Sequence, residues 1–326
     1  MLKLMDCTLR DGANVVGTGF SARLTKMMIE GLIESNINII EFGCAYGIGA
    51  NIDAPLKDSE YIELIAPYRG QAELGMFLSY FNGTKEVAEL AKSGGLDFLR
   101  VGANAGDGEK AKNAVRLVKN AGLICRYSMM KGYILSADKL AEEAKMLEDF
   151  GADEVTIMDS AGTMTPDEVS EYITALKRAT RIPVAFHGHN NLGLSTANAI
   201  AAAHAGADVL DCGLMGMARS AGNLATEVAV AVMQRRGMLQ YVDLYKLLHF
   251  IDEKLSPEMY GYGYKSAISV IDLVYGLSGC HSSFAKLFAD IAEERGVDLY
   301  RLIIETSAID RKAPTAELIN NVASKL

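Results

Sequence analysis

The chain has few of the residues that interrupt or cross-link a fold. Of its 326 residues only 6 are proline, and its 5 cysteines are widely scattered without a CxxC pair. Neither a disulfide framework nor a thiolate zinc site is therefore indicated, so we expect the cysteines to be small apolar core residues. They are Cys7, Cys44, Cys125, Cys212 and Cys280.

An excess of basic residues is also missing. The 32 Lys and Arg stand against 41 Asp and Glu, which leaves a formal charge of −9 and argues against nucleic acid as a partner. No apolar run approaches the roughly 18 to 20 residues that span a bilayer. Charged residues Asp6, Arg10 and Asp11 lie where a signal peptide would be apolar. We therefore expect no membrane association and a cytoplasmic location.

Apolar residues are plentiful. Half of the residues are hydrophobic and 22% are charged, which excludes disorder and provides for a large core. Short apolar or β-branched runs alternate with longer segments of helical period, a pattern typical of a parallel sheet. Eight strands are predicted, over residues 3–7, 38–43, 73–79, 97–102, 123–129, 154–158, 183–187 and 209–211.

Eight such units favour an α/β fold of the (β/α)8 TIM-barrel type over an open Rossmann sheet, which usually has five or six strands. We expect the catalytic barrel to occupy residues 1–240. Residues 241–326 read as a helical C-terminal extension, with helices over 243–255, 282–296, 298–308 and 315–326. Ser21, Ser136 and Thr165 are predicted to begin three of the barrel helices.

Polar residues that follow the strands of such a barrel are candidates for chemistry. Asp11 ends the motif DCTLRDG after the first strand, and His187 and His189 lie in HGHNNLG at the end of the seventh. Histidines two residues apart on a strand point the same way, and the first and seventh strands lie only two positions apart in a closed barrel. The three side chains are predicted to bind one divalent cation, with a metal-free polar rim as the alternative.

Two further segments follow strands. Ser160, after the sixth strand, is a candidate for holding a carboxylate beside a helix N-terminus, or else a plain helix approach. The glycine-rich residues 213–227 follow the eighth strand at a ligand-loop position. Within them Asn223 is either a further ligand or a helix cap, and the cap is the favoured interpretation.

The motifs DCTLRDG, HGHNNLG and GMARSAGN resemble those of the metal-dependent lyase and synthase superfamily. It includes hydroxymethylglutaryl-CoA lyase, isopropylmalate synthase and 4-hydroxy-2-oxovalerate aldolase, which make or break a C–C bond beside a metal-bound carbonyl. The segments Asn190-Asn191-Leu192 and His281-Ser282-Ser283-Phe284 favour the aldolase branch. The resemblance spans essentially the whole chain.

The resemblance implies a class II-type pyruvate aldolase that forms or cleaves a 4-hydroxy-2-oxo acid through a pyruvate-type enolate. Arg10 would stabilise the enolate oxygen and Ser160 would hold the carboxylate. Asn14 stands where the aldolases have a catalytic histidine, and an amide cannot take a proton near neutral pH. We therefore expect His281, in the extension, to act as the base.

The expected cofactor is a divalent cation, Mn²⁺ first, with Mg²⁺, Co²⁺ or Zn²⁺ as alternatives. Expected partners are a small-molecule 2-oxo acid, an aldehyde, an acylating aldehyde dehydrogenase and further copies of the chain. Three alternatives stay open: an acyl-CoA-dependent Claisen condensing enzyme, a binding subunit that has lost its base, and a subunit that only channels intermediates to a dehydrogenase.

Overall fold

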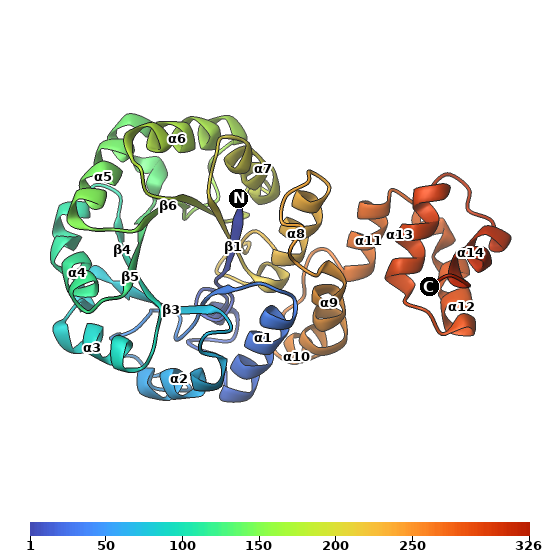
Figure 1. Ribbon diagram of the computed structural model, residues 1–326, viewed down its shortest axis with the longest axis horizontal. Helices are drawn as coiled ribbons and strands as arrows, with labels where there is room; N and C mark the ends of the chain where they lie inside the picture. The colour runs from blue at the N-terminus through green and yellow to red at the C-terminus, as the bar shows by residue number, and fades with distance from the viewer. The chain divides into compact units, whose positions relative to one another are not determined.

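Eight parallel strands close into a barrel in chain order, with β8 hydrogen-bonded back to β1 (Figure 1). The computed structural model describes all 326 residues. The predicted (β/α)8 TIM barrel is confirmed, and each strand lies within two residues of its predicted bounds at either end. The strands are β1 Lys3–Asp6, β2 Ile39–Glu41, β3 Glu73–Ser79, β4 Phe98–Asn104, β5 Ile124–Met130, β6 Glu154–Asp159, β7 Val184–Gly188 and β8 Val209–Cys212.

Helices surround the barrel (Figure 1). Three of them begin at the predicted residues: Ser21 and Ser136 accept hydrogen bonds from backbone N–H groups three residues on, and Thr165 forms a capping box with Glu168. The barrel helices are α1 Ala22–Glu34, α2 Asp58–Leu64, α3 Lys85–Ser93, α4 Gly108–Asn120, α5 Ala137–Phe150, α6 Pro166–Ala179, α7 Ser195–His204 and α8 Thr226–Gln234.

The strands read as continuous apolar runs because helices cover one face of the sheet while side chains fill the barrel inside. Phe98 of β4 is fully buried and packs against β3 at Gly75. A Cβ at Gly75 would lie 2.4 Å from the Phe98 ring, so only glycine fits there. Polar side chains that could take part in a reaction therefore lie at the ends of the strands, apart from a few buried charged residues.

The chain divides into two compact units, Met1–Asp243 and Leu244–Leu326. The second is entirely helical between its loops. The helix predicted over 243–255 corresponds to α9 and the π-helical segment that follows it, and the chain continues directly into α10. Helix α11 was not predicted. The elements are α9 Leu244–His249, the π-helical Phe250–Leu255, α10 Ser256–Gly261, α11 Val270–Ser278, α12 Ala285–Arg295, α13 Leu299–Ile309 and α14 Ala316–Ala323. Helix α11 packs on α13, and α12, α13 and α14 contact one another.

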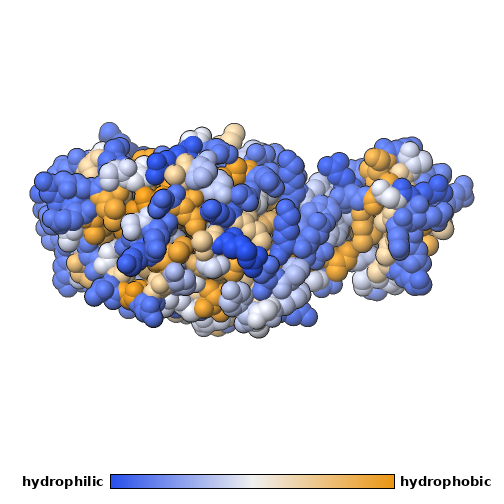
Figure 2. All heavy atoms as spheres, turned by 90° about the horizontal axis from the view of Figure 1, so that it is seen from below, coloured by the Kyte–Doolittle hydropathy of each residue, from blue (hydrophilic) through white to orange (hydrophobic).

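The surface is partly hydrophilic, and the cysteine thiols lie in the interior. Hydrophilic residues cover much of the face that Figure 2 shows, with hydrophobic ones interspersed. Every helix falls short of the length and apolar character that crossing a bilayer requires. All five cysteines are free and buried, as expected of small core residues.

Candidate active site at the carboxyl ends of the strands

The loop after β1 places Arg10 and Asp11 at the rim of the barrel. The backbone N–H of Asp11 donates to the carbonyl of Cys7 over 2.8 Å, which turns the chain tightly at the end of the strand. His187 belongs to β7, and His189 lies one residue beyond its end. Strand β8 pairs with both β1 and β7. The carboxyl ends of β1 and β7 therefore lie close together on the same rim of the barrel.

Asp11, His187 and His189 converge as predicted. Their nearest ligand atoms all lie within 4.8 Å of one another. The Oδ2 of Asp11 is 3.7 Å from His187 Nε2 and 3.9 Å from His189 Nε2. These separations are too long for hydrogen bonds. They suit three ligands of one ion, because bonds of about 2.0 to 2.2 Å put two ligands at most about 4.4 Å apart.

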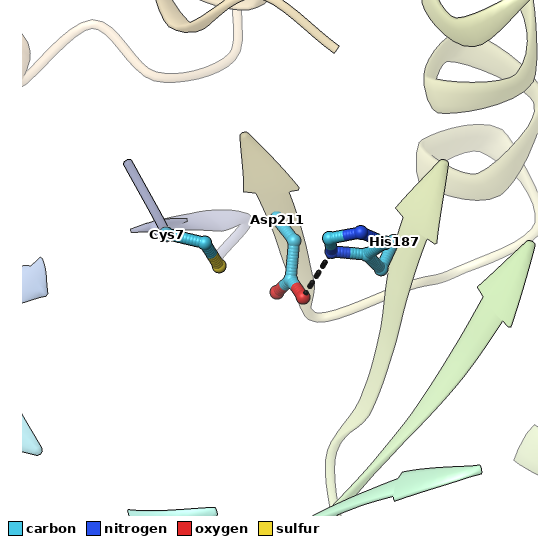
Figure 3. A group of neighbouring side chains, drawn as sticks. All are labelled: Cys7, His187 and Asp211. Carbon is cyan, nitrogen blue, oxygen red and sulfur yellow. Dashed lines mark hydrogen bonds and ion pairs between the residues drawn. The ribbon is translucent and has the colours of Figure 1, made fainter. Parts of the chain in front are cut away.

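His187 is oriented from behind by Asp211 of β8. Figure 3 shows the Asp211 carboxylate directed at the His187 ring, and its Oδ2 lies 3.0 Å from Nδ1. A proton on Nδ1 then leaves the lone pair on Nε2, which faces Asp11 and is buried without a partner. This carboxylate–imidazole arrangement is the usual support of a metal-ligating histidine.

A fully buried arginine lies below the rim. Arg100 of β4 forms ion pairs with Asp211 and with Glu41 of β2, and its Nη2 also donates to Thr156 Oγ1 over 3.0 Å. Burial alone would raise the pKa of Asp211. The positive charge of Arg100 has a larger opposite effect together with the hydrogen bond from His187, so the pKa lies below its usual range. The carboxylate that orients His187 is thus kept ionised.

Cys7, His187 and Asp211 also bring ligand atoms together (Figure 3). Arg100 already supplies the positive charge there, with its Nη1 3.7 Å from Cys7 Sγ. Burial, together with the negative charge of Asp211, raises the pKa of the Cys7 thiol. This inner cluster is therefore an ion-pair network that supports the rim.

Arg10 is held by two carboxylates. Its Nε donates to Glu41 Oε1 over 2.6 Å and its Nη1 to Asp11 Oδ1 over 2.9 Å, and its guanidinium lies 5.0 Å from the centre of the Phe77 ring. Burial would lower the pKa of Arg10, but Glu41 and then Asp11 raise it overall. The remaining nitrogen, Nη2, is buried and has no partner.

The electrostatics of Asp11 and His189 favour metal-ligating forms. Burial would raise the pKa of Asp11, but Arg10, then His187 and His189, together hold it well below its usual range. Burial first, and then His187, lower the pKa of His189 to about 4. At neutral pH the site therefore presents an ionised carboxylate and a His189 ring with a free lone pair.

Asn223 is not a helix cap, because α8 begins after Ala225. Its Nδ2 donates to Asp11 Oδ2 over 2.8 Å, and its Oδ1 is buried without a partner, so it can offer an oxygen to an ion. Asn14 also faces Asp11: its Nδ2 donates to the Asp11 carbonyl over 2.8 Å. The favoured cap interpretation of Asn223 was wrong, because its side chain bonds to Asp11 in the loop after the neighbouring strand β1.

The rim residues open into a cleft of about 530 Å³ that Ser160 also lines. Arg10, Asp11, Ser160, His187 and His189 are therefore brought together. His281 is not among them: it belongs to the second unit, where its Nδ1 accepts a hydrogen bond from Ser283 N over 3.1 Å.

Glu41, Arg100 and Asp211 were not predicted as site residues. Each is a buried charged residue of a strand that consists mostly of apolar residues. A charge in such a strand needs a buried partner. Three of them on three strands of one expected barrel were a usable signal.

Comparisons with known proteins identify relatives of the chain. The HMGL-like family profile matches residues 105–252. A 4-hydroxy-2-oxovalerate aldolase from Geobacillus genomosp. 3 is 31% identical over the whole chain and 97% of its own length. One from Carboxydothermus hydrogenoformans is 32% identical over the same shares.

Solved structures show the same fold. The HMG-CoA lyase of Bacillus subtilis superposes with a TM-score of 0.68 at 19% identity, over 79% of this chain and 93% of that one. The carboxyl transferase domain of Rhizobium etli pyruvate carboxylase, solved with pyruvate and biocytin, gives 0.69 at 18% identity, over 100% and 61%.

The barrel, its rim and the family match define the class: an HMGL-like (β/α)8 barrel with two histidines and a carboxylate at one edge. The full-length identities make the assignment narrower. The chain belongs to the family of the 4-hydroxy-2-oxovalerate aldolases. The resemblance seen in the motifs is thereby confirmed.

Replacing Arg100 by methionine should destabilise the fold by about 3 to 5 kcal/mol, because the buried Asp211 would lose its only arginine partner and Glu41 would keep only Arg10. Urea unfolding measures the change. Arg178→Met, at an exposed position of α6, is the control and should shift stability by less than about 0.5 kcal/mol. Equal stabilities of the two variants would contradict the role given to Arg100.

Proposed function

We propose that the chain is a divalent-cation-dependent carbon–carbon lyase that cleaves, and in reverse forms, a 4-hydroxy-2-oxo acid. In cleavage the 4-hydroxyl loses its proton, the C3–C4 bond breaks, and C3 gains a proton to give pyruvate and an aldehyde. The convergence of Asp11, His187 and His189 beside Arg10 carries the proposal. The full-length relatives named 4-hydroxy-2-oxovalerate aldolase support it.

The donors fit a divalent cation. Asp11, His187 and His189 would hold it, and the unpartnered Oδ1 of Asn223 is a further oxygen donor. When bound, such an ion supplies a Lewis acid that lowers the energy of the pyruvate enolate. Mixed nitrogen and oxygen ligands suit Mn²⁺, the ion we propose, and also Mg²⁺, Co²⁺ or Zn²⁺.

Arg10 would stabilise the oxygen on which negative charge develops. It is permanently charged, and its position is fixed by Glu41 and Asp11. Its unpartnered Nη2 is a donor in place before the reaction, so little reorganisation is needed when charge appears. Arg10 is thus a proposed catalytic group that contacts one of the cation ligands, Asp11, directly.

Ser160 would hold the carboxylate of the 2-oxo acid. Its Oγ accepts a hydrogen bond from the backbone N–H of Lys131 over 2.9 Å, which fixes the hydroxyl and leaves its proton free to donate. The serine lines the same cleft as Arg10 and the two histidines.

His281 remains the proposed base for the 4-hydroxyl, since Asn14 cannot take a proton. Imidazole is the side chain suited to proton exchange near neutral pH. The family resemblance also supports an acylating aldehyde dehydrogenase partner, a homo-oligomer and a cytoplasmic location, which stay predictions.

The cation site is tested by removing single ligands. His187→Ala and Asp11→Asn should purify folded, with cation affinity reduced 10- to 100-fold or more, because the remaining donors cannot complete the coordination. Elemental analysis and circular dichroism measure the two properties. His204→Ala, on the barrel surface, is the control and should keep its metal. Unchanged metal in His187→Ala would refute the assignment.

Pyruvate should exchange its C3 protons with solvent in the presence of the protein and a divalent cation, because enolate formation needs no aldehyde. Proton NMR in deuterated buffer follows the loss of the methyl signal. Arg10→Lys should slow the exchange by about 10²-fold, since lysine lacks the second directed donor. Exchange no faster than with the cation alone, for pyruvate and 2-oxobutyrate, would favour the Claisen enzyme instead.

His281→Ala should slow aldol cleavage by about 10²- to 10⁴-fold and leave cation binding intact, as expected for loss of a general base. The pH–rate profile of the parent should lose its acidic limb in this variant. A profile and a rate identical to those of the parent would remove His281 from the mechanism and leave it only its hydrogen bond to Ser283.

A further inference from the structure

The cleft contains a second arginine that the proposed reaction does not use. Arg219 follows β8, in the loop before α8, and lines the same cleft as Arg10 and the two histidines. Its side chain is exposed and forms no ion pair with any carboxylate of the protein. An unpaired cation in a substrate cleft is available to a negatively charged ligand.

Arg219 is nevertheless held in place. Its Nε donates to Asn14 Oδ1 over 2.7 Å, and its guanidinium lies 5.2 Å from the centre of the Tyr46 ring. Asn14 in turn donates to the carbonyl of Asp11 over 2.8 Å. The side chain of Asn14 therefore links a rim residue to Arg219, and the two terminal nitrogens of the guanidinium remain free to bind a ligand.

The cleft that Arg219 lines has room for a long ligand. The cleft, at about 530 Å³, holds on the order of 18 water volumes of about 30 Å³ each. It therefore has room for a substrate longer than the five carbons of 4-hydroxy-2-oxovalerate. Amide and hydroxyl groups of Asn51, Asn82 and Ser220 also line it.

We propose that Arg219 binds a carboxylate or phosphate group at the far end of the aldehyde, so that the acceptor of this enzyme is an anionic aldehyde. The inference rests on the proposed function and narrows its substrate class. A guanidinium matches both anions with two parallel hydrogen bonds. Asn14 is the positioning residue, which accounts for an amide at the place of a base.

The aldol addition of pyruvate tests the proposal with pairs of aldehydes that differ in charge. Succinic semialdehyde should exceed butanal, which has the same number of carbons, by about tenfold or more in kcat/KM. Glyceraldehyde 3-phosphate compared with glyceraldehyde tests the phosphate source. Whichever anion is preferred, Arg219→Gln should bring the ratio close to one. Arg178→Gln, at the exposed α6 position, should leave it unchanged.

Two further readouts separate positioning and binding from turnover. Asn14→Ala should raise KM for the charged aldehyde several-fold and leave KM for butanal unaltered. Calorimetry with 2-oxopimelate and 2-oxoheptanoate, which lack a hydroxyl group to cleave, should give tighter binding of the dicarboxylate. Arg219→Gln should abolish that difference.

The failures are distinguishable. Lack of pyruvate proton exchange in the unmodified protein would refute the proposed function itself. Exchange with equal kcat/KM for charged and uncharged aldehydes would overturn only the anionic acceptor. A preference for anions that Arg219→Gln leaves unchanged would overturn the assignment to Arg219.

Discussion

The pairing of β8 with β1 is the constraint on which the site depends. Its register joins Lys3 to Val209 and Asp6 to Cys212, and it closes the ring with β7 one strand further on. Asp11 and His187 are 176 positions apart in the chain, yet Asp11 Oδ2 lies 3.7 Å from His187 Nε2. Without closure the strand of the carboxylate and that of the imidazoles would lie six positions apart in an open sheet.

Closure of the barrel also buries charged side chains, which form ion pairs both inside the barrel and at its rim. Arg100 pairs with Glu41 and Asp211 inside the barrel, and these two carboxylates then position Arg10 and His187 at the rim. Each charge of this network thus has a partner, because an unpaired one would be too costly in a low-dielectric interior. The same ion pairs that permit burial fix the directions of the reacting groups.

Local signals in the sequence were sufficient for the barrel and for the rim, and insufficient for its supports. Strand periodicity and caps such as Ser136 act within a few residues, and motifs at strand ends are placed by the fold class itself. The bonds of Asp211 and Asn223 join residues far apart in sequence, which no short pattern encodes. Helix α11 was missed although the sequence carries signals for it: Ser269 caps its first turn, and the buried Val270 and Val274 lie at helical spacing.

In the proposed active site one cation lies between Asp11, His187 and His189 and binds pyruvate there. Electron paramagnetic resonance of the protein loaded with Mn²⁺ tests this arrangement. We expect nitrogen couplings from two imidazoles and broadening of the Mn²⁺ lines when ¹⁷O-labelled pyruvate is added. A spectrum without imidazole nitrogen, unaltered by the labelled pyruvate, would contradict it.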